Sequence, residues 1–128
     1  MAALAYLDTH VVVRLYATGT TDLPKGASSQ LQSSELLKIS PMVRLELQYL
    51  WEIGRVKQSP ASTLDYLSTH LGLQVCDMTF ASAIHAAQSE NWTRDPFDRL
   101  IVAQARLSQA TLLTRDRLIH QHYPLAVW

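Results

Sequence analysis

Cysteine is nearly absent from the sequence, and so are long apolar stretches. Cys76 is the single cysteine, which excludes a disulfide within the chain and a cysteine-rich zinc site. No apolar run approaches the ~18 residues of a membrane-spanning helix, and the first residues lack the basic start of a signal peptide. These absences predict a cytoplasmic protein with no membrane segment.

The sequence also has no excess charge of either sign. Eleven basic and eleven acidic residues give a net charge of zero, which excludes a globally basic nucleic-acid binder but not a local basic patch. Because a neutral surface favours association, an oligomer or a bound partner is expected. Its 128 residues, of which 48% are hydrophobic, predict one domain over residues 1–128 with a buried core.

Short apolar runs alternate with segments that carry helix signals. Capping residues followed by proline mark three helix starts, at Ser40-Pro41, Ser59-Pro60 and Asp95-Pro96, and Thr9 is expected to cap the first helix. The expected strands are 4–7, 36–39, 73–76, 111–114 and 125–127, and the expected helices are 10–16, 27–34, 41–53, 60–70, 79–88, 97–107 and 115–122. This alternation predicts a three-layer α/β/α fold with a central, mainly parallel sheet of four or five strands.

Four acidic residues fall where the expected strands end or the expected helices begin. Asp8 ends the first strand and Asp116 follows the fourth. Asp98 lies in the first turn of its helix, and a helical wheel places Glu46 on or beside the buried face of another helix. Because ligands of parallel sheets bind outside the carboxyl ends of the strands, these acids are expected to meet in one cleft.

Each acid also has a simpler explanation when it is taken alone. Asp95 is most simply a helix cap, and Asp98 complements the dipole of the same helix. Glu46 could pair with Arg14 or Arg44, and the two strand-end aspartates could cap the turns that follow them. As a set, however, gathered carboxylates repel each other unless a cation lies among them, and oxygen ligands without Cys or His select Mg²⁺ or Mn²⁺.

The sequence around these acids resembles that of PIN-domain ribonucleases, specifically the VapC-like toxins of bacterial type II toxin–antitoxin systems. Segments 6–10, 43–47, 93–105 and 112–116 are similar, in this order, to the four motifs of the family. The third is the sharpest match, because Asp-Arg-Leu-Ile-Val-Ala-Gln-Ala at 98–105 differs little from the family's Asp-Arg-Leu-Leu-Ile-Ala-Gln-Ala. The resemblance covers nearly the whole chain.

The resemblance implies an activity and a set of site residues. The activity is metal-dependent hydrolysis of RNA phosphodiester bonds by an endoribonuclease that acts as a toxin. The metal ligands implied are Asp8, Glu46, Asp98 and Asp116, with Asp95 as a possible addition, and the residues implied to hydrogen-bond the acids are Thr9 and Thr114. The implied partners are an RNA substrate, a small cognate antitoxin and a second copy of the chain.

Other residues near the motifs leave alternatives open. The candidates for contact with RNA phosphates are Arg94, Arg99, Arg115 and Arg117, although salt bridges to the acids are an alternative that especially suits Arg99. Trp92 could stack on a base but more commonly such a residue packs on its own domain. The apolar helical stretches through Trp51 and 64–67 suit either a docking surface or the core.

Two other functions compete with the nuclease. A non-catalytic PIN-like module would bind RNA or protein with an incomplete site, which the presence of all four acids disfavours. A phosphate-handling α/β domain of the receiver or phosphatase type would need a second acid near Asp8, where Thr9 and His10 stand. The four glycines are dispersed, so the sequence has no glycine-rich phosphate loop.

Overall fold

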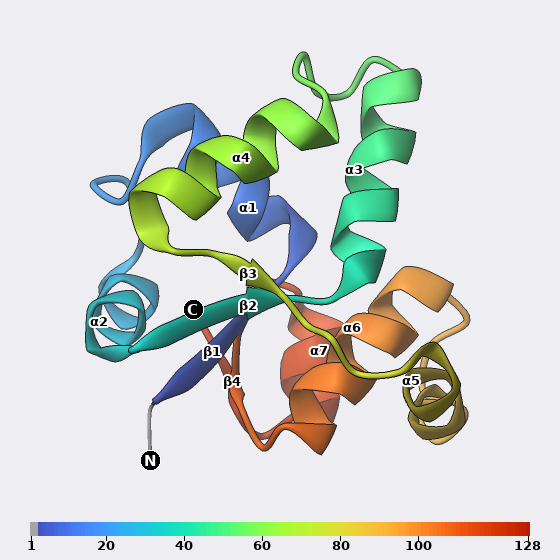
Figure 1. The fold of residues 1–128 in the computed structure, drawn as a ribbon. Helices are drawn as coiled ribbons and strands as arrows, with labels where there is room; N and C mark the ends of the chain where they lie inside the picture. Colours follow the sequence, from blue (N-terminus) through green and yellow to red (C-terminus); the bar gives the residue numbers. More distant parts are fainter. Residues whose placement is uncertain (1–2) are drawn as a thin grey trace.

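A five-stranded sheet with parallel pairing throughout forms the centre of the structure, which is a computed structural model that describes residues 3–128. The strands lie in the order β3-β2-β1-β4-β5, with β1 in the middle (Figure 1). Their bounds are β1 Leu4–Leu7, β2 Leu36–Ile39, β3 Gln74–Val75, β4 Thr111–Leu113 and β5 Ala126–Val127. The predicted parallel sheet is confirmed, with five strands.

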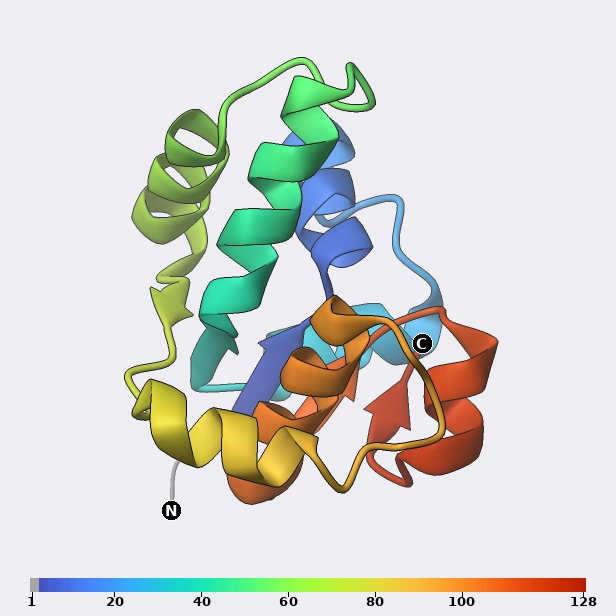
Figure 2. The same ribbon diagram turned by 90° about the vertical axis from the view of Figure 1, so that its right-hand side faces the viewer.

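Helices cover both faces of this sheet. Their bounds are α1 Thr9–Thr18, α2 Lys25–Ser33, α3 Pro41–Glu52, α4 Pro60–Leu71, α5 Phe80–Ala87, α6 Pro96–Leu107 and α7 Arg117–His122. Figures 1 and 2 show α1, α3 and α4 packed together on one side, with α5, α6 and α7 on the other. The three layers agree with the predicted α/β/α architecture. None of the helices described is long and apolar enough to cross a bilayer.

The helix starts follow the capping signals, with one difference at α1. The Ser40, Ser59 and Asp95 side chains accept backbone N–H groups of the turns that follow them. At α1 the cap is Asp8, whose carboxylate accepts the N–H of Thr9, so the prediction that Thr9 is the cap was wrong. The Thr9 hydroxyl is instead directed at α3, where it donates a hydrogen bond to Glu46.

Smaller differences concern the lengths of elements. α1 extends to Thr18, because its β-branched Val11 and Val12 are fully buried and packing overrides their preference for strands. α2 begins at Lys25, two residues earlier than predicted. β3 forms only at Gln74–Val75, where the sheet ends and both residues are exposed.

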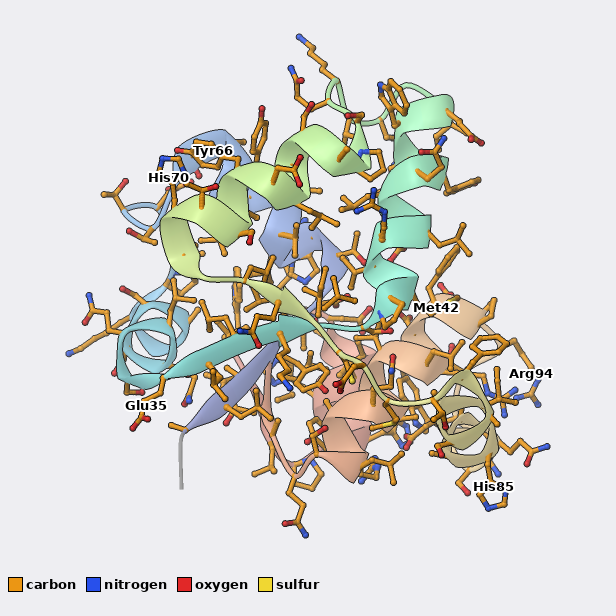
Figure 3. The ribbon with its side chains drawn as sticks, viewed as in Figure 1. Glu35, Met42, Tyr66, His70, His85 and Arg94 are labelled. Atoms are coloured by element: carbon orange, nitrogen blue, oxygen red, sulfur yellow. The ribbon has the colours of Figure 1, made fainter. Side chains whose placement is uncertain are left out.

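The hydrophobic core lies on both faces of β1 and β4 and includes part of α4. Leu64 and Leu67 are buried in this core, so they are not available as a docking surface. Trp51 is 43% exposed and Tyr66 is 45% exposed. His70 stacks on the Tyr66 ring with 4.0 Å between centroids, on the outer side of α4 (Figure 3).

Candidate metal centre

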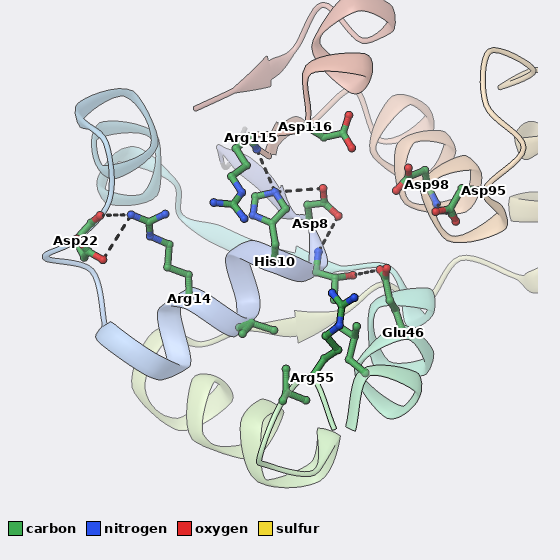
Figure 4. Close-up of a pocket in the computed structure, with 14 residues that line it drawn as sticks. Asp8, His10, Arg14, Asp22, Glu46, Arg55, Asp95, Asp98, Arg115 and Asp116 are labelled. Atoms are coloured by element: carbon green, nitrogen blue, oxygen red, sulfur yellow. Dashed lines mark hydrogen bonds and ion pairs between the residues drawn. The ribbon is translucent and has the colours of Figure 1, made fainter. Parts of the chain in front are cut away.

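A cleft of about 750 Å³ opens at the carboxyl ends of β1 and β4, bordered by α1, α3 and α6. Its acidic lining residues are Asp8, Asp22, Glu46, Asp95, Asp98 and Asp116 (Figure 4). The parallel sheet explains this arrangement, because the segments that leave β1 and β4 emerge at the same edge. The structure therefore brings all five acids singled out in the sequence to one cleft.

Asp8 is the most constrained of these acids. It is 5% exposed and occupies the capping position of α1. Its Oδ1 accepts the backbone N–H of Thr9 at 2.8 Å, and its Oδ2 accepts the hydroxyl of Thr114 at 2.6 Å. Thr9 follows β1 and Thr114 follows β4, so residues at the carboxyl ends of these two strands orient both oxygens of Asp8.

Glu46 reaches the cleft from the second turn of α3. The Thr9 hydroxyl donates a hydrogen bond to Glu46 Oε1, which ties α1 to α3 beside Asp8. Burial raises the pKa of the Glu46 carboxyl, and the charges of Asp8 and Asp95 raise it further, while the hydrogen bond from Thr9 opposes them. Glu46 is thus a half-buried acid with negative neighbours on the cleft side.

Asp95 and Asp98 come from the first turn of α6. Asp95 caps this helix, and its Oδ1 accepts the N–H of Phe97 at 2.9 Å and that of Asp98 at 3.4 Å. Burial, the largest cause, and the negative charges of Asp95 and then of the other three predicted acids together raise the pKa of Asp98 to about 7. The first turn of α6 therefore carries two different carboxylates. Asp95 is fixed as the helix cap, and Asp98 lies close to several other negative charges.

Asp116 is the cap of α7 and is linked to Asp8 through Thr114. Its Oδ1 accepts the N–H of Ile119 at 3.1 Å, and its own N–H is donated to Thr114 Oγ1 at 3.1 Å. Thr114 is fully buried, so this hydroxyl is shielded from water. One threonine consequently contacts both strand-end aspartates.

His10 lies among these groups although its sequence position carried no clear signal. Its Nε2 accepts the backbone N–H of Arg115 at 3.1 Å, so this nitrogen acts as an acceptor in that hydrogen bond. Burial lowers the pKa of His10, against the opposing effect of the Asp8 charge. Nε2 also lies 3.5 Å from Asp8 Oδ2, a contact that becomes an ion pair only when the imidazole is protonated.

Only one of the four arginines predicted to meet RNA lines the cleft. Arg115 does so, whereas Arg94 and Arg99 donate to the carbonyl oxygens of Asn91 and Gln88, and Arg117 lies outside the lining. Residues next to an acid in the sequence need not share its cleft, since consecutive helical residues point about 100° apart. Among the residues described, Arg99 forms no ion pair with an acid.

Two other arginines, Arg14 and Arg55, line the cleft instead. Arg14 could have been found, because it lies one turn after His10 on the same face of α1. Arg55 could not, because it stands in the turn after α3, whose path depends on tertiary packing. Trp92 packs on its own domain, with its ring stacked on His122 at 5.0 Å.

The donor set fits a hard divalent cation in its chemistry. All the predicted ligands are carboxylates, and burial together with neighbouring negative charge raises the pKa of both Glu46 and Asp98. Within residues 3–128, however, no three His, Cys, Asp or Glu side chains approach closely enough to form a ready-made ion site. The carboxylates line one cleft without converging on one point.

Comparison with known proteins places the chain in a family. It resembles VapBC2 from Rickettsia felis bound to a promoter DNA fragment, with 20% identity, 96% of each chain covered and a TM-score of 0.63. A toxin–antitoxin complex from Klebsiella pneumoniae matches with 18% identity, 97% and 96% coverage and a TM-score of 0.66. DNA-bound VapBC from Salmonella typhimurium matches with 20% identity, 98% and 96% coverage and a TM-score of 0.61. No curated protein matches significantly. The PIN domain family model matches residues 5–123, and the chain belongs to this family.

Proposed function

We propose that this protein is a metal-dependent endoribonuclease and the VapC-like toxin of a toxin–antitoxin pair. The observation that carries the proposal is the gathering of Asp8, Glu46, Asp98 and Asp116 in one open cleft. A structural ion-pair network would supply cations to balance them, yet no arginine or lysine pairs with any of these four acids in the part of the chain described. Uncompensated carboxylates in a cleft favour a bound cation.

These four acids would hold Mg²⁺ or Mn²⁺, and Asp95 would add charge from the same side. A divalent cation bound there stabilises the negative charge that develops on the phosphodiester during hydrolysis. Thr114 and Thr9 orient Asp8 and Glu46 through hydrogen bonds, which reduces the rearrangement that ion binding requires. His10 holds the backbone before Asp116 through the Arg115 N–H.

The partners follow from the family and from the similar structures. The Klebsiella pneumoniae structure is a toxin–antitoxin complex, so we propose that a small antitoxin covers the acidic cleft of this chain. We also propose a homodimer and a cytoplasmic location, because the chain has no net charge to oppose association and no disulfide. The alternative is a PIN-like module that binds without cleaving, and the complete set of acids disfavours it.

A cleavage assay tests the proposal. Protein freed of any antitoxin is incubated with a labelled RNA pool and Mg²⁺ or Mn²⁺, with and without chelator. Asp98→Asn should lower cleavage by about 100-fold or more, because a ligand charge is lost while the size and helix position of the side chain are kept. Asp77→Asn, an exposed acid outside the cleft lining, is the matched control and should cleave normally. Cleavage that persists in chelator, or at full rate in Asp98→Asn, would contradict a mechanism that runs through metal at these acids. RNA binding without any metal-dependent cleavage would favour the binding module.

A further inference from the structure

The cleft has a basic side as well as an acidic one. Figure 4 shows Arg14 and Arg115 across Asp8 from Asp95 and Asp98, with Arg55 at the lower rim. The elements that carry the arginines are α1, the turn after α3 and the turn between β4 and α7. Three distant segments of the chain thus contribute an arginine to the same cleft.

Arg14 is held in place before any ligand arrives. Its Nη2 donates to the backbone carbonyl of Asp22 at 2.8 Å, and its guanidinium lies 5.5 Å from the centre of the Trp128 ring. The Asp22 carboxylate is 3.5 Å away and partly offsets the arginine's charge. An arginine fixed by a carbonyl and an aromatic face loses little side-chain entropy when it binds an anion.

Arg115 and Arg55 have fixed backbones and exposed side chains. The Arg115 N–H is donated to His10, and the Arg55 N–H is donated to the carbonyl of Leu50 at 2.8 Å, where α3 ends. Neither side chain forms an ion pair with an acid within residues 3–128, even though carboxylates line the same cleft. Their guanidinium groups are therefore available to a ligand from solution.

We infer that Arg14, Arg55 and Arg115 form a phosphate-binding side of the cleft, which holds the RNA strand beside the position of cleavage. The inference rests on the proposed function and names how its substrate is bound. Among the residues described, Asp22 is the one acid that forms an ion pair with any of these three guanidinium groups, so they keep positive charge for the repeated phosphates of a single strand. The carboxylate side repels phosphate unless a cation is present, so without metal the arginines carry the binding.

The inference is tested by binding in chelator, where no metal-dependent cleavage can occur. Fluorescence anisotropy measures the affinity for a short labelled oligouridylate across a series of salt concentrations. Arg14→Gln, Arg55→Gln and Arg115→Gln should each weaken binding by about threefold to tenfold and lower the salt-dependence slope by about 0.7. Arg44→Gln, an exposed arginine on α3 outside the cleft lining, should match the parent in both measurements. Arg14→Lys keeps the charge, and should therefore keep the slope.

The outcomes separate this inference from the proposed function. Arginine variants that bind as the parent does, while the parent still cleaves RNA with Mn²⁺, would overturn the phosphate side and leave the nuclease proposal standing. A parent that binds no oligouridylate in chelator would also overturn it. Binding that depends on the three arginines, in a protein that cleaves no RNA with metal, would support the phosphate side and reject the nuclease. Melting curves show whether a variant loses binding because it unfolds. This control matters most for Arg14→Gln, since Arg14 packs beside Trp128.

Discussion

The hydroxyl of Thr114 lies 2.6 Å from Oδ2 of Asp8, which joins the carboxyl ends of the two central strands β4 and β1. The hydroxyl oxygen of Thr114 also accepts the backbone N–H of Asp116 at 3.1 Å. A single fully buried hydroxyl therefore donates to one proposed ligand and accepts from the residue that carries another. The spacing of the two aspartates depends on it.

Replacing this hydroxyl by a methyl group should destabilise the protein. Thr114→Val keeps the shape of the side chain but leaves Asp8 Oδ2 and the Asp116 N–H without their buried partner. The free energy of unfolding should fall by about 1–3 kcal/mol, as measured by urea denaturation. Thr114→Ser retains the hydroxyl and should cost about 1 kcal/mol through the lost methyl group. A larger loss in Thr114→Ser than in Thr114→Val would show that the methyl packing outweighs the hydrogen bonds.

The raised pKa of Asp98 predicts how stability without metal depends on pH. The folded protein keeps this proton up to about pH 7, whereas the unfolded chain releases it near the ordinary value of 3.8. The folded state thus binds more protons within this window, so the free energy of unfolding should decrease as pH rises through it and level off above. Asp98→Asn removes this contribution. In chelator, its melting temperature should exceed that of the parent by a margin that grows with pH between those limits. A margin independent of pH would contradict the prediction.

Metal binding should be linked to the same proton. Because a bound cation requires an ionised carboxylate, protons compete with Mn²⁺ below the Asp98 pKa of about 7. The apparent affinity, measured by titration calorimetry, should be about tenfold higher near pH 8 than near pH 6. Asp98→Asn should bind Mn²⁺ more weakly and with less pH dependence. An unchanged affinity across this range in the parent would show that Asp98 does not ligate the ion.

Local signals predicted most of the fold and the acids of the cleft. The Ser-Pro and Asp-Pro pairs mark the starts of α3, α4 and α6, because capping chemistry acts within a few residues. The cap of α1 was harder to predict, since Asp8 and Thr9 are both residue types that cap helices well. The structure uses Asp8 there because the Thr9 hydroxyl is engaged by Glu46, which lies 37 residues away.

Residues whose position depends on tertiary contacts were not predictable. Leu64 and Leu67 belong to the core because this face of α4 packs on α1 and α3, and periodicity alone does not show which face is covered. Arg55 lies in an irregular turn, and only the packing of α3 against α1 brings it to the cleft. Sequence adjacency to the acids therefore did not indicate which arginines line the cleft, whereas the strand ends did indicate which acids line it.

The ion pair between the buried Glu90 and the partly exposed Arg106 gives the last prediction. Glu90 accepts Nε of Arg106 at 2.8 Å and Nη2 at 3.2 Å, and also accepts the indole N–H of Trp92 at 2.8 Å. The side chain of Glu90 is 4% exposed, whereas that of Arg106 is 44% exposed. This pair fastens the loop before Asp95 to the far end of α6.

The two partners should differ in what their loss costs, because only the carboxylate is shielded from water. Arg106→Met leaves a buried charge without its cation and should lower the free energy of unfolding by about 3 kcal/mol. Glu90→Gln leaves a neutral acceptor for Trp92 and an arginine that water can solvate, and should cost about 1 kcal/mol. Urea denaturation at neutral pH measures both, with Arg94→Met as an exposed arginine control. If Glu90→Gln proved the more costly variant, burial of the carboxylate would not be the dominant effect at this pair.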